Sequence, residues 1–231
     1  MQLLLILLSI LPGALIIFYI YWRDRHEPEP VHYLLMCFLF GAVSTYPVLK
    51  MEQFGVRDLG LYSNSQDIFM TFSFAFAVIA FSEEFAKYLF LRFYIYKKEA
   101  FDEPFDGIVY AVMISMGFAT VENIIYVVVR PSGVQDALET GFIRMLTAVP
   151  AHAFFAIAMG YFAGKAKFNP NKEGRYLLLG LLFAILLHGT YDFLIFMHLG
   201  ATVVYFTLIG LALLSVLFLN QHSKKKASVV Q

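Results

Sequence analysis

The stretch FAVIAFSEEFAKYLFLRF, residues 76–93, decides the fold of this protein. It is apolar enough to cross a membrane, yet Glu83, Glu84 and Lys87 interrupt it. A charge at the centre of a spanning helix costs about 3 kcal/mol on insertion scales, and such residues normally face the interior of a helix bundle. We therefore expect a membrane-spanning helix whose polar residues serve a function.

The composition places the whole chain in the membrane. Of its 231 residues, 60% are hydrophobic and 15% are charged, whereas soluble domains carry about 45–50% apolar and about 25% charged residues. The apolar runs show no alternation, which excludes a transmembrane β-barrel. Cys37 is the only cysteine, which excludes an internal disulfide and a CxxC metal site. No linker or repeat divides the chain, so we predict an all-α polytopic bundle with one integral-membrane domain over 1–231.

The apolar runs predict about seven transmembrane helices. A spanning helix needs about 20 mostly apolar residues, and the stretches that qualify are 3–22, 32–50, 67–96, 107–129, 143–164, 175–197 and 200–219. The first lacks a basic start and a small-residue cleavage site, so we interpret it as an uncleaved span. The stretch RDRHEPEP between the first two spans contains two Glu-Pro pairs, which predict an extended, solvated connector.

The distribution of Lys and Arg predicts an outside N-terminus and a cytoplasmic C-terminus, because cytoplasmic loops carry an excess of these residues. In that orientation the cytoplasmic side holds eleven of them: Arg23, Arg25, Lys97, Lys98, Lys165, Lys167, Lys172, Arg175, Lys224, Lys225 and Lys226. The outer side holds three: Lys50, Arg57 and Arg130.

Four ionisable residues on four different spans are predicted to lie at one depth. Glu83, Glu122, His152 and His188 are each 13 to 16 residues from the cytoplasmic end of their span. At a rise of 1.5 Å per residue, all four lie about 20–24 Å from the cytoplasmic side. The hydrocarbon core is about 30 Å thick, so this layer falls in its outer half.

The spacing of the polar residues indicates which of them interact. Lys87 follows Glu83 by four residues and Glu84 by three, so it can pair with either carboxylate on one helical face. Asp192 follows His188 by four residues, so its carboxylate could orient the imidazole. Carboxylates that accept a proton from water, beside groups that donate one, are the components of hydrolysis.

Several longer motifs resemble the PrsW family of intramembrane proteases, which belongs with the glutamate-type enzymes that include the CAAX prenyl endopeptidases. In chain order the motifs are RDRHEPEP, EEFAK, FDGIVYAVMISMGFATVENIIY, AVPAHAFFAIAMGYFAGKAKF and LLHGTYDFL. The similarity extends from the first span to the basic tail.

This resemblance implies roles for the polar layer. Glu83 and Glu84 would supply the carboxylate that activates water. His152 and His188 would hold the water or stabilise the tetrahedral oxyanion, and Asp192 would orient His188.

The same resemblance also concerns Glu122 and Lys87. Glu122 matches the second glutamate motif of the family. The CAAX enzymes place an arginine four residues after the second glutamate, whereas here Lys87 follows by three residues. Prenyl-cysteine substrates are therefore not inferred.

The resemblance also implies a biological role. The chain would be a multi-pass hydrolase of the bacterial cell membrane that performs site-1 cleavage of a membrane-anchored anti-sigma factor at its extracytoplasmic side, as part of an envelope stress response. Its partners would be that single-span substrate and the lipid bilayer, with no nucleic acid and no cofactor.

Three alternatives remain open on the sequence. A zinc protease would use His152, His188 and a glutamate as ligands, which matches the three protein ligands of catalytic zinc sites, although no HExxH motif occurs. A proton-coupled transporter would use the carboxylates as a relay. A non-enzymatic scaffold would not need a polar layer at one depth.

Overall fold

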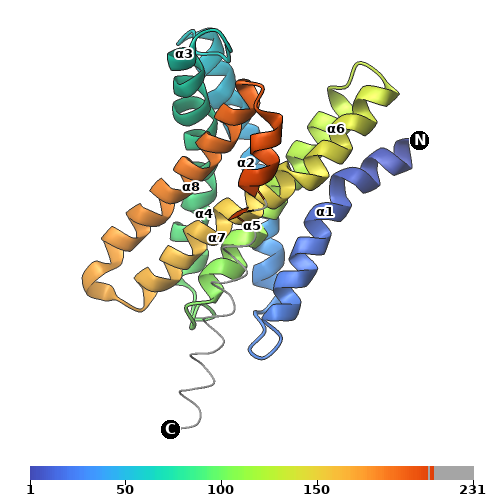
Figure 1. Ribbon diagram of the computed structural model, residues 1–231. Helices are drawn as coiled ribbons and strands as arrows, with labels where there is room; N and C mark the ends of the chain where they lie inside the picture. Colours follow the sequence, from blue (N-terminus) through green and yellow to red (C-terminus); the bar gives the residue numbers. More distant parts are fainter. Residues whose placement is uncertain (208, 211–231) are drawn as a thin grey trace.

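The computed structural model describes residues 1–207, 209 and 210, and all regular elements in this part of the chain are helical (Figure 1). The helices are α1 (Gln2–Arg23), α2 (Val31–Arg57), α3 (Ile68–Ser73), α4 (Phe81–Phe93), α5 (Asp106–Ile124), α6 (Val134–Leu146), α7 (Ala148–Lys167) and α8 (Glu173–Phe196). Between them lie the π-helical segments η1 (Phe74–Ala80) and η3 (Ile125–Val129), and the short 3₁₀ turns η2 (Ile95–Lys97) and η4 (Pro170–Lys172). A helix satisfies its own backbone hydrogen bonds, which is why apolar runs of this length fold as helices in lipid.

These elements combine into six helical stretches that are long and apolar enough to cross a membrane within the described residues: Gln2–Arg23, Val31–Arg57, Ile68–Lys97, Asp106–Val129, Val134–Lys167 and Pro170–Phe196. They correspond to the first six predicted spans, and the predicted all-α membrane bundle is confirmed. Residues 200–207 are also helical, but most of the predicted seventh span, 200–219, lies outside the described residues.

Two spans extend well beyond their predicted ends. Helix α2 continues to Arg57, two turns past the predicted end at residue 50. The fifth span starts at Val134 rather than at residue 143. Polar residues end an apolar run, but a helix does not need apolar side chains to continue its hydrogen bonds, so hydropathy underestimates its length.

The fifth span has a break between α6 and α7 that the hydropathy pattern did not predict. Thr147 lies there with φ −122° and ψ −64°. Pro150 has no backbone N–H and cannot bond to the carbonyl of Leu146, which interrupts the helix at this point. The hydroxyl and the backbone N–H of Thr147 both donate to the carbonyl of Ile143, at 2.8 and 2.9 Å. Thr147 therefore separates α6 from α7 within one helical stretch, Val134–Lys167.

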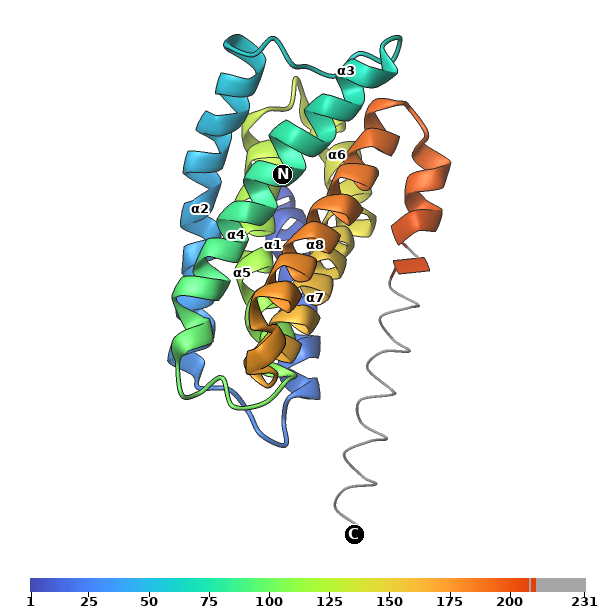
Figure 2. The same cartoon turned by 90° about the vertical axis from the view of Figure 1, so that its left-hand side faces the viewer.

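Glycines let the central helix α5 pack closely against its neighbours. Helix α5 lies inside the bundle, in contact with α1, α2 and α7 (Figure 2). A Cβ atom added to Gly160 would lie 2.3 Å from the carbonyl oxygen of Gly107, and one added to Gly41 would lie 1.8 Å from that of Ile114. Small residues at such positions allow membrane helices to approach through their backbones.

The connections after α1, η2 and α7 lie together at one end of the bundle (Figures 1 and 2). They and the adjoining helix ends carry the basic residues predicted to face the cytoplasm, apart from those of the tail. That this end faces the cytoplasm stays a prediction from the sequence.

Most of the connector between α1 and α2 is exposed, as predicted, but Glu29 is an exception. Glu29 is only 5% exposed, and it accepts a hydrogen bond from the hydroxyl of Tyr110 on α5. Its backbone N–H donates to Oδ2 of Asp24 at 3.2 Å. Burial raises the pKa of the Glu29 carboxyl from its ordinary value of 4.5 to about 8, with a further contribution from the charge of Asp106.

Candidate active site

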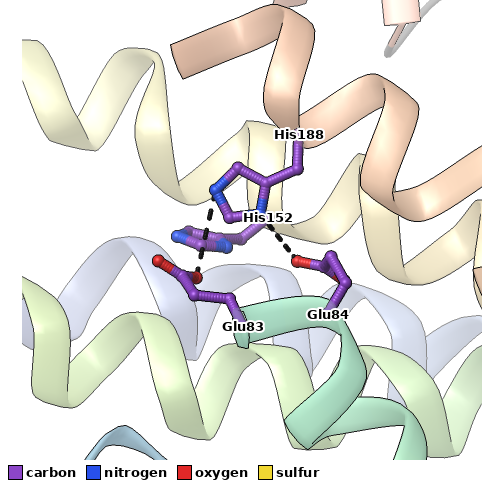
Figure 3. A group of neighbouring side chains, drawn as sticks. All are labelled: Glu83, Glu84, His152 and His188. Carbon is purple, nitrogen blue, oxygen red and sulfur yellow. Dashed lines mark hydrogen bonds and ion pairs between the residues drawn. The ribbon is translucent and has the colours of Figure 1, made fainter. Parts of the chain in front are cut away.

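Three helices bring four acid and imidazole side chains into one buried cluster. Glu83 and Glu84 come from α4, His152 from α7 and His188 from α8, and all four side chains point toward one another (Figure 3). Each of these residues is at most 4% exposed. Removing ionisable groups from water is costly unless they are paired and hydrogen-bonded, so their partners determine what the cluster can do.

A π-helical segment adjoins each helix that carries a predicted site glutamate: η1 precedes α4, and η3 follows α5. Segment η1 ends at Ala80, three residues before Glu83, and η3 begins at Ile125, three residues after Glu122. Such segments are frequent at functional sites. No sequence signal for them was recognised.

Lys87 lies among the members of the cluster. Its Nζ donates to Oε2 of Glu83 at 3.1 Å and to Oε1 of Glu84 at 2.8 Å. The same Nζ lies 3.3 Å from Nδ1 of His152 and 4.2 Å from the centre of the Phe118 ring. The pairing predicted from the spacing is therefore observed with both carboxylates at once.

Glu122 orients His152 from the far side of the ring. Its Oε2 lies 2.8 Å from Nε2 of His152. The tautomer that satisfies both contacts of the ring carries its hydrogen on Nε2, donates it to Glu122 and leaves the Nδ1 lone pair for Lys87. The same Oε2 lies 2.9 Å from Nη2 of Arg144, and Nε of Arg144 donates to Oδ1 of Asn123 at 2.7 Å.

His188 connects the two glutamates to Asp192. Its Nδ1 lies 2.8 Å from Oε1 of Glu84, while its Nε2 lies 3.3 Å from Oδ2 of Asp192 and 3.9 Å from Oε2 of Glu83. The contact with Asp192 is a charge contact rather than an aligned hydrogen bond, because Oδ2 of Asp192 has no hydrogen-bond partner in the described part of the chain. In its protonated form the ring donates from both nitrogens.

A cavity of about 160 Å³ borders this network. Its polar lining comprises Thr45, Glu52, Glu83, Glu122, Tyr126, Arg144, His152, His188, Tyr191 and Asp192. Glu52 and Phe196 lie near the ends of α2 and α8 that are remote from the basic loops, and both belong to the lining. The cavity therefore extends from the cluster toward the opposite end of the bundle.

The two adjacent glutamates differ in their access to this cavity. Glu83 lines it, whereas Glu84 does not. Oε1 of Glu84 is engaged by Lys87 and His188, and its Oε2 is buried without a hydrogen-bond partner among the described residues. Both contacts of Glu83 use Oε2, which leaves its Oε1 for the cavity.

The structure brings all seven predicted site residues into one network: Glu83, Glu84, Lys87, Glu122, His152, His188 and Asp192. It adds residues that the sequence reasoning missed. Arg144 is the most important of them, because it contacts Glu122 directly. A signal existed: Arg144 is a charge inside an apolar stretch, eight residues before His152 on the same predicted span.

A buried set of carboxylates and imidazoles beside a polar cavity, within helices that cross the membrane, defines a membrane-embedded hydrolase. The comparisons with known proteins agree with this class. Residues 29–219 match the family model described as "PrsW family intramembrane metalloprotease". The chain therefore belongs to the PrsW family of intramembrane proteases and is a multi-pass membrane protein.

Curated relatives carry the same family name. The chain is 37% identical over 191 residues to "Protease PrsW" of Geobacillus kaustophilus, covering 83% of this chain and 79% of the relative. It is 37% identical over 197 residues to the protein of that name from Clostridioides difficile, covering 84% and 80%. It is 36% identical over 188 residues to the one from Bacillus subtilis, covering 81% and 80%. No solved structure is significantly similar to this chain.

The family description raises the question of a metal ion. Ligand atoms of Glu83, Glu84, His152 and His188 all lie within 4.8 Å of one another, and this donor set suits zinc. Zinc requires ligands at about 2.0–2.2 Å. Lys87 lies among these groups instead, at hydrogen-bonding distances of 2.8 to 3.3 Å from three of them. In this arrangement the four side chains do not accommodate a metal ion.

Proposed function

We propose that this protein is an intramembrane endopeptidase that uses a water molecule activated by Glu83 to cleave a membrane-anchored anti-sigma factor at its extracytoplasmic side. The observation that carries the mechanism is the unequal access of the two glutamates to the cavity. Of the adjacent pair, Glu83 lines the cavity, and Glu84 is enclosed by Lys87 and His188.

In this mechanism Glu83 accepts one proton from water while the water oxygen attacks the carbonyl carbon of the scissile peptide. General bases of this kind act from within hydrogen-bonding distance of the proton they remove. The C–N bond then breaks, and the same proton passes from Glu83 to the leaving amine. The second proton of the water remains on the new carboxyl group, so that one water is consumed for each bond broken.

The imidazoles and their partners hold the charges of the intermediate. Protonated His188 lines the cavity and can donate to the oxyanion that forms at the attacked carbonyl. Glu84 and Asp192 fix the orientation of that ring. Glu122 does the same for His152.

Two features support cleavage on the extracytoplasmic side. The cavity extends toward the end of the bundle remote from the loops rich in Lys and Arg, and such loops favour the cytoplasm. In an anti-sigma factor with one spanning helix, the segment that follows this helix on the extracytoplasmic side would lie next to that end of the bundle. A second intramembrane protease would then act on the remaining fragment, and a sigma factor for envelope stress would be released.

The decisive experiment uses the full-length protein in liposomes with a single-span substrate that carries the candidate cleavage site. Glu83→Gln should abolish cleavage, because the amide cannot accept the proton, while the variant inserts and accumulates like the wild type. Glu84→Gln should lower activity and also protein stability, because it weakens contacts to Lys87 and His188. Full activity of Glu83→Gln would refute the assignment of the base.

The same preparation tests the zinc alternative. Full activity after exhaustive chelation, with no metal in elemental analysis, would exclude it. Loss of activity that zinc restores would replace the metal-free mechanism. The transporter alternative receives no support from the family, whose named members are proteases.

A further inference from the structure

Lys87 occupies its place in the cluster with every donor satisfied. An ammonium group has three hydrogens to donate, and three acceptors surround this one: Oε2 of Glu83, Oε1 of Glu84 and Nδ1 of His152. The Phe118 ring covers it at 4.2 Å, where a cation is attracted to the aromatic face. Lys87 is only 3% exposed.

The surrounding groups are also arranged as the ligands of a transition metal commonly are. Metal-bound histidines usually donate their second ring N–H to a carboxylate, which fixes the tautomer. His152 has this arrangement, because Nε2 faces Glu122 and the lone pair of Nδ1 faces the cluster. Oε2 of Glu84 is buried and has no hydrogen-bond partner among the described residues, so one carboxylate oxygen is available as well.

The same acceptor atoms therefore serve two incompatible occupants. We propose that the Lys87 ammonium is the cation that this cluster holds at rest, and that a divalent transition metal binds Glu83, Glu84, His152 and His188 only by displacing it. The ammonium and the ion carry like charge and need the same lone pairs. The metal affinity of this chain is consequently set by Lys87 as much as by the four ligands.

The experiment measures the binding of Zn²⁺ to the full-length protein in detergent micelles, by competition with a chromophoric chelator and by elemental analysis. Lys87→Met removes the charge and keeps most of the side-chain volume. Partners outside the ligand set alone change metal affinity by about 10- to 100-fold, so the variant should bind one Zn²⁺ at least about tenfold more tightly than the wild type. Lys50→Met is the control, because Lys50 is exposed and lies over the Tyr46 ring, outside the cluster.

A charge-matched variant covers the case in which Lys87→Met fails to fold. Glu83→Gln/Lys87→Met leaves the net charge of the cluster unchanged and retains three ligands, which is the number that catalytic zinc sites use. It should also bind zinc more tightly than the wild type, and zinc should raise its unfolding temperature by preferential binding to the folded state. Adding His152→Ala should remove the gain.

Two results would overturn the inference. One is a wild-type zinc affinity equal to that of both Lys87 variants, which would mean that the ammonium does not compete. The other is the absence of zinc binding in every variant, which would mean that the cluster is not a metal site in any state. Binding is measured without a substrate, so neither result depends on the proposed proteolysis.

Discussion

Replacement of Arg144 tests whether the residues around the cluster control catalysis by holding His152 in place. Arg144 comes from α6 and contacts Glu122 at 2.9 Å and Asn123 at 2.7 Å. Glu122 in turn holds Nε2 of His152 at 2.8 Å. Arg144 does not contact Glu83, Glu84 or Lys87 through any of these bonds, so it acts as a positioning residue.

The expected magnitude follows from the ion pair with Glu122 and the hydrogen bond to Asn123 that Arg144→Met removes. A hydrogen bond that involves a charged group contributes about 1.5–3 kcal/mol, and a partly exposed ion pair adds up to about 1 kcal/mol. The side chains of Arg144 and Glu122 are 15% and 16% exposed and line the cavity, so water screens part of this energy. We therefore expect Arg144→Met to lose about 2–3 kcal/mol of interaction energy in total. If the whole loss acts by moving His152 out of place, kcat/KM falls about 30- to 150-fold.

The assay is cleavage of a single-span substrate in liposomes, combined with the unfolding temperature of the purified protein. Arg144→Lys keeps the charge and should recover part of the activity, because it restores an ion pair with Glu122 without the planar fork. Arg130→Met is the matched control. Arg130 lies 4.5 Å from the centre of the Tyr126 ring, as Arg144 does at 4.4 Å, but it is exposed and, in the part of the chain that the structure describes, forms no ion pair with Glu122. Activity of Arg144→Met within about twofold of Arg130→Met would refute the reasoning.

Two other predictions concern stability. Gly160→Ala places a Cβ 2.3 Å from the carbonyl oxygen of Gly107 and should cost about 3 kcal/mol of folding free energy or more. Gly174→Ala is the control, because a Cβ at Gly174 would lie in open space. Equal unfolding temperatures of the two variants would contradict this prediction. Glu29 has a folded-state pKa of about 8 against an ordinary value of 4.5, so the folded protein binds more protons between these values and loses stability as the pH rises through them. Glu29→Gln should remove that loss, and parallel profiles of unfolding temperature against pH for the variant and the wild type would show that Glu29 is not responsible.

Much of the fold could be predicted because a bilayer restricts what a chain can do. Lipid supplies no partner for a backbone N–H or C=O group, so each long apolar run becomes a helix that satisfies its own bonds. The ends of these helices were less predictable. The helix is interrupted at Thr147, because Pro150 removes a backbone donor. Helix α2 continues to Arg57, although polar residues end its apolar run at about residue 50.

The candidate site was predictable to a similar degree. Glu83, Glu122, His152 and His188 could be placed at one depth because the rise of an α-helix per residue is constant. The depth of a residue, however, does not determine which faces of the helices pack against one another. The contact of Arg144 with Glu122 depends on how α6 packs against α1, α7 and η3.

By itself, the sequence determined that this protein is a helical membrane bundle and predicted which polar residues share one depth in it, since hydropathy and helical rise are local properties of the chain. Only the tertiary structure decided that Glu83 faces the cavity, that Glu84 is enclosed and that Lys87 lies among the four candidate ligands. The physical reason is that these three facts depend on distances between atoms of different helices. Such distances are set by the packing of the helices. Close glycine contacts, the break at Thr147 and two π-helical segments all affect that packing.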